Sequence, residues 1–88
     1  MPTLSMFYGI IVKMFVEKGG KHHTPHLHAV YGEKEVVISL DGEVIEGSLP
    51  SNKMKLLTAW MEIHADELQA NWKLLYEGDV HFRIDPLR

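Results

Sequence analysis

The sequence contains no cysteine, so disulfide bonds and cysteine-ligated zinc or iron–sulfur centres are excluded. It also lacks any apolar run near the roughly 20 residues that a membrane-spanning helix needs. The opening residues, Met1-Pro2-Thr3, show no basic stretch of the kind that begins a signal peptide. We therefore expect a cytoplasmic protein in a reducing compartment.

Positive charge is scarce as well. Nine lysines and arginines stand against twelve aspartates and glutamates, for a net charge of −3, which is the wrong sign for binding nucleic acid through bulk charge. No helix-turn-helix pattern or basic helix is present, which disfavours direct DNA recognition. Lys13, Lys18 and Lys21, which lie near a group of histidines, could still form the local cationic groove that an RNA-cleaving enzyme needs.

What is present fits one small folded domain over residues 1–88. Hydrophobic residues make up 45% of the chain and charged residues 24%, a balance typical of globular proteins. A domain of this size removes only about 60–65% of its unfolded surface from water. A partner could supply further burial, so we expect self-association or a small partner protein, and no membrane.

Alternating apolar residues predict a sheet in the first half of the chain. Residues 4–16 are apolar on both alternating sets, which indicates a strand buried on both faces. Gly32-Glu33 and Asp41-Gly42 are typical of two-residue hairpin turns. We expect a four- or five-stranded, mostly antiparallel meander, with strands at about 4–16, 26–31, 35–40 and 43–47 and a short further strand at 80–84.

The hydrophobic period changes to that of a helix over residues 51–77. Apolar residues recur there at steps of three and four positions. Pro50 suits a first helical turn, and Gly78 suits a C-terminal stop. We expect an α+β fold in which one long C-terminal helix packs against the sheet, with a break near Ala65-Asp66 as an alternative.

This helix has a wide apolar arc, covering about half of its circumference. Trp60 is the first candidate within the arc for contact with another chain, and the alternative is that the arc belongs to the core. His64, Glu67 and Asn71 interrupt the arc, and buried polar groups need partners. They either bond to one another and to the sheet or, together with Trp60, line a binding cleft.

Four of the six histidines fall within seven positions: His22, His23, His26 and His28. His26 and His28 share one strand face because side chains alternate along a strand, and imidazole is a frequent zinc ligand. His22, His26 and His28 are therefore candidate ligands of a divalent metal, and His26 and His28 are also a candidate acid–base pair. The alternative is a polar strand face whose imidazoles bond to neighbouring groups.

The expected hairpin register decides whether the strand histidines can meet the helix. It separates an apolar face, with Leu27, Ala29, Val36, Ile38 and Ile45, from an opposite face with His26, His28, Val37, Ser39, Val44 and Glu46. A site that adds His64 and Glu67 to the strand histidines requires the helix to cover the histidine face. Burial of apolar side chains favours the other face.

Several motifs follow one another along the chain: Pro25-His26-Leu27-His28, Tyr31-Gly32, Gly47-Ser48-Leu49-Pro50, Glu67-Leu68 and Asn71-Trp72. Together with Trp60 they resemble a family of short bacterial proteins known as domain of unknown function 4160. The resemblance implies that His22, Pro25, His26 and His28 are the family's loop positions. This chain departs from the pattern at His23 and Thr24, where the family has asparagine and proline.

The resemblance also carries a functional expectation. Genes of the family often lie beside another short gene, in an arrangement like a toxin–antitoxin pair. With the apolar helix arc, this suggests a protein-binding component of such a pair, which needs no cofactor. The alternative is a histidine-based metal-binding protein with zinc at His22, His26 and His28, or a small hydrolase or ribonuclease that uses these histidines for proton transfer.

Overall fold

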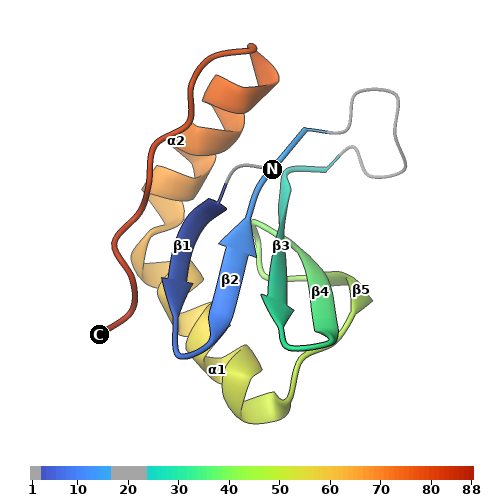
Figure 1. Ribbon diagram of the computed structural model, residues 1–88. Coiled ribbons are helices and arrows are strands. Elements are labelled where there is room, and N and C mark those ends of the chain that lie inside the picture. The colour runs from blue at the N-terminus through green and yellow to red at the C-terminus, as the bar shows by residue number, and fades with distance from the viewer. Residues whose placement is uncertain (1–2, 17–23) are drawn as a thin grey trace.

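The computed structural model describes residues 3–16 and 24–88, which form one five-stranded sheet and two helices (Figure 1). The elements in chain order are β1 (Thr3–Phe7), β2 (Ile10–Lys13), β3 (His26–Tyr31), β4 (Lys34–Ser39), β5 (Val44–Gly47), α1 (Ser51–Ile63) and α2 (Ala65–Tyr76). Neither of the helices in this part of the chain is long and apolar enough to cross a membrane.

The sheet is an antiparallel meander in the order β1-β2-β3-β4-β5. Both helices lie behind one face of it, and the C-terminal segment runs beside α2 and β1 (Figure 1). This two-layer arrangement confirms the predicted α+β class and the predicted meander.

The predicted first strand, at about 4–16, is wrong in extent because it folds into a hairpin. β1 and β2 are joined through Tyr8 and Gly9, whose φ angles are 49° and 81°, and Phe7 pairs with Ile10 across the turn. Two successive residues with positive φ form the tight turn that matches the twist of paired strands. Tyrosine is a rare residue in that conformation, so the turn signal was hidden within an apolar run.

The hairpin between β3 and β4 has the predicted register. Leu27 pairs with Ile38 and His28 with Val37, across the predicted two-residue turn. The register of β5 differs from the prediction because a bulge shifts it between Val37 and Ile38. As a result Val44, not Ile45, lies opposite Ile38, and Ile45 is 39% exposed instead of joining the core.

Two helices replace the single long helix of the prediction. The interruption falls at His64, whose φ and ψ are −109° and 28°, one residue before the alternative break point at Ala65-Asp66. Both flanking turns keep helical bonding: the His64 amide donates to the Trp60 carbonyl, and the His64 carbonyl accepts from the Leu68 amide. The interruption lets α2 follow a different direction from α1 (Figure 1).

The core forms between the helices and one face of the sheet. Leu27, Ala29 and Ile38 of the sheet are fully buried, and so are Leu57 and Leu68 of the helices. The helices therefore cover the apolar face of the sheet, as burial of apolar side chains predicts. The opposite face, which carries the histidines, is met by α2 at His26, whose ring lies 5.3 Å from that of Trp72; elsewhere the helices of the described residues leave this face uncovered.

The C-terminal segment is extended but forms no strand, so the strand expected at 80–84 is absent. One backbone hydrogen bond, from the Ile84 amide to the Leu4 carbonyl (2.9 Å), attaches this segment to the edge of β1. The Ile84 side chain is only 3% exposed and belongs to the core cluster. The segment therefore acts as a cover for the edge of the sheet and for the helices beside it.

Candidate functional site

The two histidines of β3 are held by different acceptors. His26 is fully buried, and its Nδ1 lies 2.6 Å from the Thr24 carbonyl oxygen. His28 is 8% exposed, and its Nδ1 lies 3.0 Å from Oε2 of Glu35 on β4. His22, the third predicted metal ligand, and His23 lie outside the described residues.

A row of contacting aromatic rings runs through these histidines. Phe15, which follows β2, stacks on His28 with ring centroids 4.4 Å apart. The His28 and His26 rings are 5.4 Å apart, and the His26 ring is 5.3 Å from Trp72 of α2. The imidazoles are therefore fixed in orientation both by hydrogen bonds at Nδ1 and by aromatic neighbours on either side.

The polar residues of the helix arc bond to one another and to the C-terminal segment. His64 Nδ1 lies 2.6 Å from Glu67 Oε1. The buried Asn71 side chain donates from Nδ2 to the Glu67 carbonyl (3.2 Å) and accepts from the Phe82 amide at Oδ1 (2.8 Å). His64, Glu67 and Asn71 therefore bond to one another, which is one of the two alternatives predicted from the sequence. Their further partner is the C-terminal segment and not, as expected, the sheet.

Trp60 is enclosed by the chain itself. Its exposed fraction is 0%, its ring lies 5.2 Å from that of Phe7, and its Nε1 donates to the Asp85 carbonyl (2.8 Å). In this fold Trp60 lies in the core and does not reach the surface, in line with the alternative that the apolar arc of the helix belongs to the core. A partner surface has to be sought on other residues.

The combined site of helix and strand histidines does not form. The helices pack mainly on the other face of the sheet. α2 reaches His26 through Trp72, whereas the contacts of His64 are to Glu67 and to the Trp60 ring. Within residues 3–16 and 24–88, no group of three or more histidines, aspartates or glutamates could hold a metal ion.

A row of apolar residues on the uncovered sheet face was missed by the sequence analysis as a candidate site. Met6 pairs with Ile11, and Ile11 pairs with Val30, so the three side chains form one cross-strand row. Met6 is 55% exposed, and the other two are half-buried. The signal was present: residues 4–16 are apolar on both alternating sets, but this was interpreted as burial on both faces.

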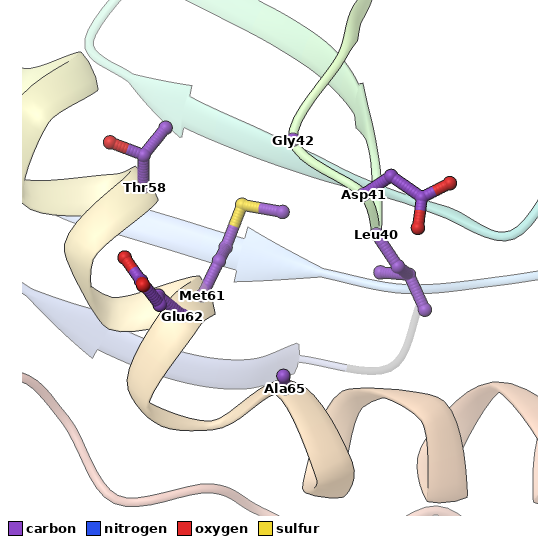
Figure 2. Close-up of a pocket in the computed structure, with 7 residues that line it drawn as sticks. All are labelled: Leu40, Asp41, Gly42, Thr58, Met61, Glu62 and Ala65. Atoms are coloured by element: carbon purple, nitrogen blue, oxygen red, sulfur yellow. The ribbon is translucent and has the colours of Figure 1, made fainter.

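Two hollows in the described part of the surface are lined by residues other than Trp60, His64, Glu67 and Asn71. The larger, about 420 Å³, lies between α1 and the connection from β4 to β5 (Figure 2). Met61 extends into it, whereas the carboxylates of Asp41 and Glu62 point away from each other, so they do not form a shared cation site. A second hollow, about 310 Å³, is lined by His28, Glu35 and Glu46 on the uncovered face.

Comparison with known proteins places the chain in a family but gives no activity. No curated protein and no solved structure matches it. The family described as "Domain of unknown function (DUF4160)" matches residues 9–73, which span β2 to most of α2. The match confirms the resemblance seen in the motifs. Because it covers well over half of the chain, the protein belongs to the domain of unknown function 4160 family.

Proposed function

We propose that this protein is a small binding module that docks a partner protein on the uncovered face of its sheet. The observation that carries the proposal is the cross-strand row of Met6, Ile11 and Val30. An antiparallel sheet with one face in water normally presents polar side chains there. Here one row of outward side chains across three neighbouring strands is apolar, which favours a face that a partner covers.

The surroundings of the row resemble the rim of a protein interface. Glu35 pairs with Val30 at one end of the row, and Lys13 lies on the same face, two residues along β2 from Ile11. Apolar centres with a charged border are typical of protein-binding surfaces. Tyr8, 54% exposed at the adjacent turn, adds an aromatic side chain of the kind enriched at such surfaces.

The family context supports a specific kind of partner. The resemblance implies that family genes often lie beside another short gene, and we propose that the product of such a gene in the cytoplasm is the protein that covers this face. The module would then be one component of a toxin–antitoxin-like pair. This role needs neither a cofactor nor catalytic residues.

The test is co-expression with the product of the neighbouring short gene, followed by co-purification and a measurement of affinity. Met6→Lys places a charge in the row at an exposed position. We expect it to weaken binding at least tenfold, because a charge in the apolar centre of an interface loses its hydration. Ile63→Lys is the matched control, since Ile63 is 65% exposed on α1 and away from this face.

Two outcomes would contradict the proposal. Equal loss of binding in Met6→Lys and Ile63→Lys would show that the partner does not recognise the uncovered sheet face. Full binding by both variants would place the interface elsewhere. Light scattering of the protein alone tests whether a second copy of the chain covers this face. In that case Met6→Lys would have a lower mass in solution than the wild type.

A further inference from the structure

We infer that residues 79–88 of one chain dock on a second copy of the chain, so that two copies exchange this C-terminal segment reciprocally. The groove that receives the segment is the one that it already fills within a single copy, beside β1 and α2 (Figure 1). The inference is independent of the proposed docking on the uncovered sheet face. It rests on how the segment is attached, on what lies beneath it and on the turn that precedes it.

The segment is attached only to the rest of the fold and not to itself. Each of its three hydrogen bonds to the fold beyond α2's end uses a backbone group of the segment: the amides of Phe82 and Ile84 and the carbonyl of Asp85. Their partners are, in the same order, Asn71 Oδ1 (2.8 Å), the Leu4 carbonyl (2.9 Å) and Trp60 Nε1 (2.8 Å). No backbone hydrogen bond joins two residues within the segment. The segment therefore loses no structure of its own when it moves to another copy.

The groove beneath the segment requires an occupant. Trp60 and Asn71 are fully buried, and without the segment Trp60 Nε1 and Asn71 Oδ1 would lose their hydrogen-bond partners. The segment covers them while burying little of itself: Ile84 is 3% exposed and Val80 is 80% exposed. A second copy supplies a segment with the same amides, carbonyl and Ile84 side chain. Exchange therefore satisfies the same groups and needs no new complementary surface.

The turn before the segment is the place where exchange would open the fold. α2 ends in a cap in which the Asp79 amide donates to the Leu74 carbonyl (2.7 Å) and the Gly78 amide donates to the Leu75 carbonyl (3.1 Å). Gly78 has a φ of 80°, the left-handed conformation that glycine adopts at helix ends. This turn reverses the chain, so that the segment runs back beside its own α2 (Figure 1). If Gly78 takes a negative φ instead, the segment is directed away from its own groove and toward another copy.

Two glycines allow a matched pair of substitutions at this turn and away from it. Gly78 and Gly42 have φ angles of 80° and 94°, and a Cβ at either position would meet no atom within 4 Å. Alanine therefore adds backbone strain at both positions without a steric clash. At Gly78 the strain is relieved when the turn opens, because alanine favours continuation of α2. At Gly42, which lies between β4 and β5, exchange of the segment relieves no strain.

The test is light scattering of the untagged full chain over a range of concentrations, which gives the dissociation constant of the dimer. We expect Gly78→Ala to lower this constant at least tenfold relative to the wild type, because both turns lose their strain in the exchanged dimer. Gly42→Ala should leave the constant unchanged. Met6→Lys should also leave it unchanged, which separates exchange from a second copy on the uncovered sheet face.

Isotope-filtered NMR identifies the exchanged contacts directly. After ¹³C-labelled and unlabelled chains of Gly78→Ala are unfolded and refolded together, we expect nuclear Overhauser contacts between the Trp60 Nε1 hydrogen of one copy and Asp85 of the other. The wild type at high concentration gives the same measurement if Gly78→Ala does not fold.

Three results would overturn the inference. The first is a dimer without these contacts between copies. The second is an equal dissociation constant for Gly78→Ala and Gly42→Ala. The third is a monomeric Gly78→Ala whose Phe82 and Ile84 amides have lost their protection from hydrogen exchange, because the opened groove would then be left for a segment of another protein.

Discussion

Replacement of Trp60 tests whether its ring belongs to the core or to a surface. The ring is fully buried and its Nε1 donates to the Asp85 carbonyl. Trp60→Phe keeps an aromatic ring but removes the hydrogen bond and part of the side-chain volume. It should therefore lower the free energy of unfolding while leaving the mass of the protein in solution unchanged.

The magnitude follows from the two losses. A hydrogen bond contributes about 0.5–1.5 kcal/mol, and the lost part of the ring leaves a small cavity, so we expect a total of roughly 2 kcal/mol. A domain of this length has a stability of about 4–13 kcal/mol. The variant should stay folded, with a Tm lower by about 8–16 °C. Trp60→Glu buries a charge and should unfold the protein.

Urea denaturation followed by far-ultraviolet circular dichroism measures this loss without depending on tryptophan fluorescence. Ile63→Ala is the control on the same helix, because Ile63 is 65% exposed, and it should change stability by less than about 0.5 kcal/mol. The reasoning is refuted if Trp60→Phe is as stable as the wild type. It is also refuted if Trp60→Glu stays folded and forms a smaller species in light scattering.

Four further substitutions, one of them a control, test local features of the fold by thermal or urea unfolding. Asn71→Ala leaves a backbone amide of the C-terminal segment without its acceptor and should cost about 1–3 kcal/mol; a loss below 0.5 kcal/mol would argue against this clamp. Gly47→Ala places Cβ 2.2 Å from the Glu35 carbonyl oxygen and should lower the free energy of unfolding by roughly 3 kcal/mol or more. Gly42→Ala is the control: the space around Gly42 is open, so this variant should lose only about 1–2 kcal/mol. Tyr8→Asn should stabilise the protein by about 0.5–1 kcal/mol, since asparagine adopts positive φ more readily; an unchanged or lower Tm would contradict this.

Local patterns were enough to predict most of the sheet. Alternation along β3 and β4 correctly placed Leu27 and Ile38 on the covered face and His28 on the other. The β1–β2 turn was missed because its first residue, Tyr8, carries no turn signal. The bulge in β5 was missed because a single extra residue changes the register without changing the composition.

The environment of the helix residues depended on contacts that no local pattern contains. The apolar arc showed that Trp60 is either core or interface, but the choice depends on the C-terminal segment, which supplies the Asp85 carbonyl. Asn71 was correctly identified as a polar residue in need of partners, and one partner is an amide of the same segment. Long-range packing of this kind overrides the helical pattern.

For the histidines, the sequence indicated the residue type and the shared face but not the chemistry. Alternation placed His26 and His28 on the same side of β3, as observed. The acceptors at Nδ1 come from the backbone of Thr24 and from Glu35 on the neighbouring strand. Only the folded hairpin brings that carboxylate to His28, so the hydrogen-bond partners of the two rings could not be derived from spacing.

The contact between Leu4 and Ile84 has a consequence for the order in which the protein forms. These residues pair through the backbone although about eighty positions separate them in the chain. During synthesis, β1 therefore emerges well before the segment that covers its edge. Until then the growing chain would expose an unpaired strand edge and the Trp60 ring, and such species tend to aggregate. Closure of this edge is therefore a late step in folding, and it is the stage at which a chaperone or an early-bound partner would have most effect.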